Sequence, residues 1–332
     1  MYIHSLICSV FFQRFSALLS LRARSGLPRQ FSTRPFSRFF ALLVLVCTTP
    51  IAHAESPETV YFPSADGNTE LVGYVFTPIG AGPHPAVIML HGRAGPYSAN
   101  INAGCTLIGR KQASVCNATN LSKRHLMWGD YWAKHGYIAM HVDSFGPRGR
   151  AHGYARGTHG DHDRDAVNER TVRPLDAEGA LAYLTQRKDV LPNRIMLQGW
   201  SNGGSTALNV MARQTPSGSA ENYPRFRAAL VFYPGCGPGA LISQDFQSDA
   251  PVWVFLGSED EEVSPKVCAS VLQKTSSTFS GSKYKKDVEI VWYAGATHDF
   301  DDPGAKRQAT EANRIAKDDA MRRAAALFDS LP

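Results

Sequence analysis

The stretch RIMLQGWSNGGSTALNVMA, residues 194–212, joins a short apolar run to a helix-like run through a turn rich in glycine. Within it, Gly199-Trp200-Ser201-Asn202-Gly203 matches the pattern G-x-S-x-G. A sharp turn from strand to helix is sterically crowded, so it needs glycines, and it lifts the serine side chain above the sheet. The five-residue pattern alone is also typical of an ordinary glycine-serine turn. The strand before it and the helix after it favour Ser201 as a nucleophile.

Short apolar runs that end in polar residues or glycine recur along the chain, with helix-like segments between them. The expected strands are 70–78, 85–92, 137–146, 194–201, 228–235, 251–260 and 287–298, and the expected helices are about 121–135, 173–187, 203–213, 265–275 and 308–329. Continuous apolar runs suit strands that are covered on both faces. The alternation predicts an α/β domain with a mainly parallel sheet, in which 70–78, alternating and ending at Pro78, is an outer strand.

Two later strand ends supply partners for the serine. Its hydroxyl becomes a good nucleophile only when a base removes its proton, and in this arrangement the acid and then the histidine follow the serine in the chain. Asp260 follows the run VWVFLGSE, and His298 follows VEIVWYAGAT. The sequence therefore predicts a Ser201–Asp260–His298 triad. Alternatives stay open: the acidic run 259–262 is also typical of a solvated turn, Glu259 could replace Asp260, and His298 could be a loop or cap residue.

An oxyanion hole is expected at an earlier strand end, where His91-Gly92 closes the run in MLHGRAGPYS, residues 89–98. Backbone N–H groups there can face the developing negative charge, together with the N–H of the residue after the nucleophile. We assign this role to the backbone N–H groups of Arg93 and Asn202. We expect His91 to be a buried structural histidine.

Five motifs in this order carry a resemblance to a known family: HGRAGPYS, DSFGPRG (143–149), GWSNGG (199–204), LGSEDEEVSP (256–265) and YAGATHDFDDP (293–303). Over about residues 57–330 the chain resembles the dienelactone hydrolases of the α/β-hydrolase superfamily. The resemblance implies a single α/β-hydrolase domain without a large lid and without a metal or other cofactor. The founding members use a cysteine nucleophile, so Ser201 disfavours true dienelactone hydrolysis and favours a serine carboxylesterase.

Several residues near the expected site are candidates for the substrate pocket. Tyr97 and Trp200 could line an acyl pocket, although aromatic packing explains them equally well. Arg93 and Arg148 flank the site, where a guanidinium could bind a substrate carboxylate, but a structural salt bridge is the preferred interpretation of Arg148. The segment HGDHDRD, residues 159–165, has the composition of a metal site, but we interpret it as a charged, solvated loop.

The first 54 residues read as an export leader. They hold six arginines, no lysine and no acidic residue, so the remaining chain has 29 basic and 29 acidic residues and no net charge. A nucleic-acid-binding face is therefore not implied. An apolar run, 39–46, and the sequence AHA before Glu55 predict a signal peptide cleaved near Ala54–Glu55, with no stable membrane anchor afterwards. We expect a periplasmic or secreted domain at 55–332; a mitochondrial transit peptide is the alternative.

The part after the leader has four cysteines, an even number that suggests two disulfides in an exported protein. Cys236 follows one expected strand, and Cys268 lies in the helix that follows the next. Because consecutive strands are often neighbours, we expect these two to pair beside the Asp260 loop. Cys105 and Cys116 lie close together in one loop and form the second expected pair. Four buried free thiols are the alternative.

These features predict a serine hydrolase that cleaves carboxylic esters, with lactones as a second substrate class, through an acyl-enzyme. The partner is a small molecule, and a monomer is favoured. A serine peptidase of the prolyl oligopeptidase type shares the elbow, but residues 55–85 are too short for the propeller domain that such enzymes usually carry. A catalytically inactive hydrolase fold that acts as a binding protein is the alternative from another class.

Overall fold

The computed structural model describes residues 56–98, 104–158, 161–214, 224–278 and 288–331. The leader and its cleavage site lie outside these residues. Eight strands form one sheet: β1 (Glu58–Pro63), β2 (Glu70–Phe76), β3 (His84–Leu90), β4 (Ile138–Asp143), β5 (Val190–Trp200), β6 (Ala229–Phe232), β7 (Val252–Gly257) and β8 (Val288–Tyr293). Their order is β1-β2-β4-β3-β5-β6-β7-β8. All seven expected strands are present, and the five expected helices are as well.

The sheet is parallel from β4 to β8, and β1 and β2 join it antiparallel. The expected outer strand 70–78 is β2, which is second from the edge of the sheet because β1 pairs with its outer side. β1 is short and buries only Val60 and Phe62 of its six residues, so it lacks the apolar run that marks the other strands.

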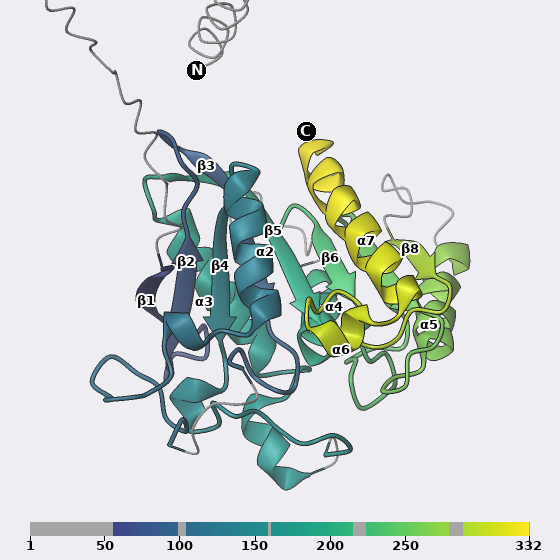
Figure 1. Cartoon of the computed structure of the whole chain (residues 1–332), viewed down its shortest axis with the longest axis horizontal. Coiled ribbons are helices and arrows are strands. Elements are labelled where there is room, and N and C mark those ends of the chain that lie inside the picture. Colours follow the sequence, from purple (N-terminus) through teal and green to yellow (C-terminus); the bar gives the residue numbers. More distant parts are fainter. Residues whose placement is uncertain (1–55, 99–103, 159–160, 215–223, 279–287, 332) are drawn as a thin grey trace, which may run out of the picture. The chain divides into compact units, whose positions relative to one another are not determined.

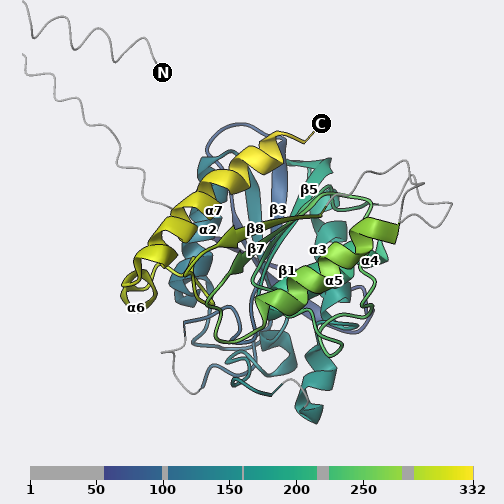
Figure 2. The same ribbon diagram turned by 90° about the vertical axis from the view of Figure 1, so that its right-hand side faces the viewer.

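Helices cover both faces of the sheet (Figure 1 and Figure 2). Figure 2 shows α2 (Lys123–Lys134) and α7 (Glu311–Asp329) on one face, and α3 (Arg173–Thr185), α4 (Asn202–Arg213) and α5 (Pro265–Thr278) on the other. The short helices are α6 (Ala305–Gln308), η1 (Ala118–Asn120), η2 (Gly146–Arg148) and η3 (His162–Val167). Gly136, with φ 84°, ends α2 in the left-handed conformation that glycine adopts without strain.

The strand side chains alternate between two buried apolar clusters. In β4, Ile138, Met140 and Val142 face the cluster that packs on α3, α4 and α5, whereas Ala139 faces the cluster under α2 and α7. Strands buried on both faces are rigid supports, so the loops at their carboxyl ends are held at fixed positions. The expected site residues lie in these loops.

Two disulfides link loops at the carboxyl ends of the strands. Cys236, after β6, is bonded to Cys268 in α5, and Cys105 is bonded to Cys116. These are the two pairs that the sequence analysis expects. The first pair joins the neighbouring strands β6 and β7 through the segments that follow them, and it brackets the loop that carries Asp260.

Candidate active site

Ser201 lies on the turn between β5 and α4, with φ 51° and ψ −116°. Its N–H donates to the carbonyl of Phe232, the last residue of β6, at 2.9 Å. A Cβ at Gly199 would come within 2.2 Å of the Gly203 carbonyl, and a Cβ at Gly203 within 2.1 Å of the Leu90 carbonyl. Both glycines of the pattern are therefore required by close backbone contacts, as expected for a strand-to-helix elbow.

His298 and Asp260 form a buried pair. His298 Nδ1 lies 2.8 Å from Asp260 Oδ2, and both side chains are almost fully buried. The other oxygen, Asp260 Oδ1, accepts the N–H groups of Glu262 at 2.8 Å and Val263 at 2.9 Å. The carboxylate is thus held from two sides, and it can fix both the orientation and the tautomer of the imidazole.

Two further residues of the acidic run, Glu261 and Glu262, also interact with His298, which the sequence analysis missed. Glu261 accepts the backbone N–H of His298 at 2.9 Å, and Glu262 Oε2 lies 3.9 Å from His298 Nε2. Glu259 is exposed, and among the contacts described its side chain touches only the neighbouring Ser258 hydroxyl. The side chains of Asp260 and Glu262 are therefore buried, whereas Glu259 and Glu261 are exposed, as in a solvated turn. Asp260 rather than Glu259 contacts the imidazole.

The surroundings of His298 favour its protonated form. Burial lowers its affinity for a proton, but the hydrogen bond to Asp260 and the charges of Asp299 and Glu262 outweigh this effect and raise the pKa of His298 above 6.5. A base with a raised pKa accepts a proton readily and is deprotonated only at a correspondingly higher pH.

Backbone strain is concentrated around these residues. Within the described part of the chain, three residues other than glycine have positive φ: Ser201 at 51°, Tyr233 at 36° and Asp299 at 57°. Tyr233 follows β6, its ring centroid is 4.6 Å from that of His298, and Asp299 is the next residue after His298. Such conformations cost of order 1–3 kcal/mol each, and they cluster at functional sites.

The two N–H groups expected to form the oxyanion hole lie on adjacent segments. A Cβ at Gly92 would be 3.5 Å from the Ser201 Cβ, so the segment after β3 passes directly beside the elbow. Neither Arg93 N–H nor Asn202 N–H has an acceptor among the residues that the structure describes. Asn202 N–H also belongs to the first turn of α4, where the helix dipole favours negative charge.

The Arg93 side chain is already paired. Its guanidinium contacts both oxygens of Glu262 at 3.1–3.2 Å and donates to the Tyr154 carbonyl at 3.0 Å. Arg156 contacts the same carboxylate. A role of Arg93 in binding a substrate carboxylate thus requires that Glu262 be displaced.

A buried carboxylate that the sequence analysis overlooked links the elbow to the histidine loop. Asp301 is fully buried and accepts the indole N–H groups of Trp128 and Trp200, each at 2.8 Å, and the hydroxyl of Tyr233. Arg124 contacts Asp299 and donates to the Tyr233 hydroxyl at 2.9 Å. Asp301 lies within the quoted motif YAGATHDFDDP, which was the one available signal for it.

The three pocket candidates have internal partners. Trp200 is fully buried, and its indole N–H donates to Asp301. The Arg148 guanidinium donates to Asp176, Asp66 and the Ser144 carbonyl. These contacts agree with a structural salt bridge for Arg148. Substrate contact by these side chains stays an untested prediction.

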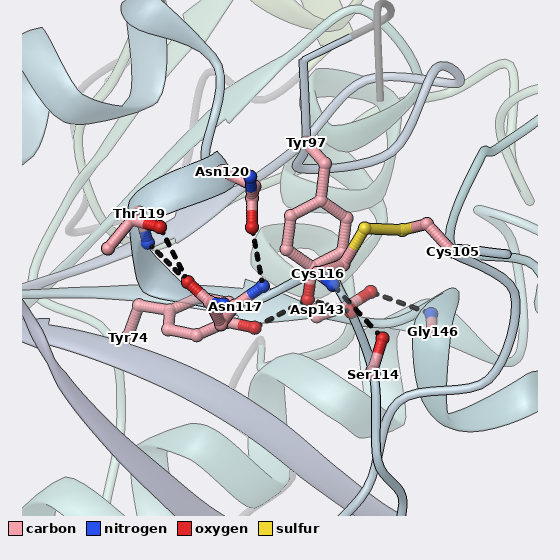
Figure 3. Close-up of a disulfide and its surroundings, with 10 residues drawn as sticks. All are labelled: Tyr74, Tyr97, Cys105, Ser114, Cys116, Asn117, Thr119, Asn120, Asp143 and Gly146. Atoms are coloured by element: carbon pink, nitrogen blue, oxygen red, sulfur yellow. Dashed lines mark hydrogen bonds between the residues drawn. A yellow bond between two sulfur atoms is a disulfide. The ribbon is translucent and has the colours of Figure 1, made fainter. Parts of the chain in front are cut away.

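Figure 3 shows the third candidate, the ring of Tyr97, beside the Cys105–Cys116 disulfide. The Tyr97 hydroxyl donates to Asp143 Oδ2 at 2.9 Å, and Asp143 Oδ1 accepts the N–H of Gly146 at 2.8 Å. Burial, partly offset by these hydrogen bonds, raises the pKa of Asp143 to about 6. The cluster anchors the loop after β3, which carries the Arg93 N–H, to the end of β4.

His91 lies where a buried structural histidine was expected. His91 is fully buried, its Nδ1 lies 2.8 Å from the Gly92 carbonyl, and its Nε2 lies 3.2 Å from the Ser144 N–H. A ring that donates at Nδ1 and accepts at Nε2 is neutral, and burial lowers the pKa of His91 well below 6.5.

The segment 159–165 was weighed above as a metal site and interpreted as a charged, solvated loop. Residues 159–160 lie outside the described residues, and His162 is exposed and contacts only Asp165 among the pairs described.

Comparison with known proteins agrees with this fold. The structure is similar to that of a dienelactone hydrolase-like promiscuous phosphotriesterase from metagenomic libraries, at a TM-score of 0.56 and 19% identity over 84% of this chain and 99% of that one. It is also similar to an esterase of the planctomycete Thermogutta terrifontis, at a TM-score of 0.54 and 17% identity over 83% of this chain and 95% of that one. The sequence model of the dienelactone hydrolase family matches residues 120–331. Since this match spans more than half of the chain, the protein belongs to the dienelactone hydrolase family.

Proposed function

We propose that the protein is a serine hydrolase that cleaves carboxylic esters of small molecules, with lactones as a second substrate class. Two observations support this proposal: the His298–Asp260 pair at 2.8 Å and the strained elbow that carries Ser201. The proteins with similar structures include an esterase and a phosphotriesterase, which agrees with cleavage of small-molecule esters.

In the first half of the reaction, His298 Nε2 removes the Ser201 hydroxyl proton while Ser201 Oγ attacks the ester carbonyl carbon. The N–H groups of Arg93 and Asn202 donate to the resulting oxyanion. Asp260 accepts the Nδ1 proton of His298 and stabilises the imidazolium without itself becoming protonated. His298 then gives the proton to the departing alcohol, which leaves an acyl-enzyme on Ser201.

In the second half, His298 removes a proton from water, and the hydroxide attacks the acyl carbon. The oxyanion again accepts hydrogen bonds from the two backbone N–H groups. Collapse of this intermediate returns the proton from His298 to Ser201 and releases the carboxylic acid. No metal or organic cofactor takes part in the proposed reaction.

We further propose that residues 55–332 act as one exported, monomeric domain after the leader is removed. Two disulfides are compatible with an oxidising compartment, where such bonds persist. Among the described helices, none is both long enough and apolar enough to cross a membrane.

The test is hydrolysis of p-nitrophenyl acetate and butyrate by the purified protein and two serine variants. Ser201→Ala should lower kcat by several orders of magnitude, because it removes the nucleophile. Ser205→Ala is the matched control: Ser205 is buried in the first turn of α4, and its hydroxyl donates to the Gly235 carbonyl at 2.8 Å and lies 3.3 Å from the Ser201 carbonyl. Its kcat should stay within about twofold of wild type. A Ser201→Ala variant that keeps more than about a tenth of wild-type kcat would contradict the proposal.

A further inference from the structure

Arg173 is a buried cation with an unusual set of partners. It is the first residue of α3, and none of its surface is exposed. Nη1 of the guanidinium donates to the side-chain oxygen of Asn202, and Nη2 donates to the His91 carbonyl at 2.8 Å. Both acceptors are neutral oxygens.

These two acceptors belong to the two segments that carry the proposed oxyanion donors. Asn202 supplies one N–H itself, and His91 is two residues before Arg93, which supplies the other. The segments lie against each other, since a Cβ at Gly203 would be only 2.5 Å from the His91 carbonyl oxygen. A single planar guanidinium therefore bridges the elbow and the loop after β3.

A purely structural role does not explain this arrangement. Removing a charged guanidinium from water costs several kcal/mol, which a buried arginine normally offsets by direct bonding to a carboxylate. No ion pair within 4.0 Å joins Arg173 to a described carboxylate, although Asp176 and Glu169 act on it through space. Its neighbour Arg148 takes both oxygens of Asp176. Arg173 instead donates to the side-chain amide oxygen of Asn202 and to the backbone carbonyl of His91.

The guanidinium is also fixed in direction. Its centre lies 5.0 Å from the centroid of the Phe145 ring, which packs on its face. Lysine offers a single point of donation, whereas arginine presents a rigid fork that can reach two acceptors at once. A fixed fork between two backbone segments sets the distance and the direction of the groups attached to them.

We infer that Arg173 is a positioning residue that holds the N–H groups of Arg93 and Asn202 in register for the oxyanion. This inference rests on the proposed function, because it assigns Arg173 to the oxyanion hole of the Ser201 reaction. An oxyanion donor contributes about 10²–10³ in kcat, so a displaced pair of donors loses part of that factor. The loss should fall on kcat, since the donors bind the oxyanion more strongly than the ground-state carbonyl.

The test compares Arg173→Met and Arg173→Lys with a matched control, Arg187→Met, on p-nitrophenyl butyrate. Arg187 is partly buried, and its guanidinium donates to Asp189 at 2.8–3.0 Å and to Glu58 at 3.3 Å, neither of which lies in an oxyanion segment. Active sites are counted by titration with a fluorophosphonate, so that kcat refers to folded enzyme. We expect Arg173→Met to lower kcat about 10- to 100-fold with KM within about threefold. Arg173→Lys should be intermediate, and Arg187→Met within about twofold of wild type.

Three results would overturn the inference: kcat of Arg173→Met within twofold of wild type, a loss that appears only in KM, or an equal loss in the Arg187→Met control. If Arg173→Met does not fold, Asn202→Ala removes the acceptor but keeps the backbone N–H. That variant should lower kcat about tenfold, and an unchanged kcat would equally overturn the inference. An inactive wild-type protein would instead contradict the proposed function, so the two failures are distinguishable.

Discussion

Replacing Asp260 by asparagine should disable the histidine without changing the shape of the site. In wild type, Asp260 Oδ1 accepts two backbone N–H groups, and Oδ2 faces His298 Nδ1. An asparagine side chain can keep the two backbone bonds only if its carbonyl oxygen takes the place of Oδ1. Its NH₂ group then faces His298 Nδ1.

The energy difference between the two amide orientations can be estimated from these contacts. The reversed orientation would set the NH₂ group against two buried N–H donors, each of which loses its acceptor at a cost of about 1–3 kcal/mol. A total of about 2 kcal/mol or more corresponds to a preference of roughly 30-fold or greater for the NH₂ group facing Nδ1. The imidazole must then accept at Nδ1 and carry its proton on Nε2.

A proton on Nε2 is incompatible with the role of general base, because that nitrogen must accept the Ser201 proton. Glu262 Oε2, 3.9 Å from Nε2, stabilises the unproductive tautomer further. Loss of the productive tautomer costs about 10⁴ in kcat in the serine protease triad, and we expect a loss of that order here.

The assay is kcat for p-nitrophenyl butyrate at neutral pH, with Glu259→Gln as the matched control. Glu259 is the exposed neighbouring acid, and its replacement should leave kcat within about twofold of wild type. Circular dichroism and the thermal midpoint should show that Asp260→Asn is folded. An Asp260→Asn variant with more than about a tenth of wild-type kcat, or an equal loss in Glu259→Gln, would refute the reasoning.

Three further predictions concern the pH dependence and the disulfides. Since His298 must be neutral to act as a base and its pKa is raised, kcat/KM should rise with pH to a midpoint above 6.5; a flat profile from about pH 5 to 9 would exclude a histidine base. Glu262→Gln removes one of the charges that raise this pKa, so the midpoint should move to lower pH, and an unmoved midpoint would show that Glu262 does not act on His298. Replacing both Cys236 and Cys268 by serine should lower the free energy of unfolding in urea by about 3–4 kcal/mol in the chain-entropy model for this loop, and an unchanged midpoint would mean that the bond does not stabilise the fold.

The sequence was sufficient for the elements with strong local signals. Buried parallel strands read as continuous apolar runs, and the glycines of 199–203 mark a turn that only small residues tolerate. β1 was missed because it buries alternate residues over a short stretch and gains its place by pairing with β2.

The interior of the candidate site was much less predictable. Arg173 and Asp301 act through partners that are far away in the chain: Arg173 reaches His91 across 82 positions, and Asp301 accepts from Trp128 across 173. No local periodicity reports such contacts. The acidic run 259–262 shows the same difficulty, since its composition suits a solvated turn and only the fold brings Glu261 and Glu262 to His298.

The most direct test of the account is covalent labelling of the wild-type protein with a fluorophosphonate, followed by peptide mapping by mass spectrometry. We expect one adduct per chain, on Ser201, and loss of ester hydrolysis in proportion to labelling. Active protein that resists labelling, or an adduct on another residue such as Ser205, would contradict the assignment of Ser201 as the nucleophile.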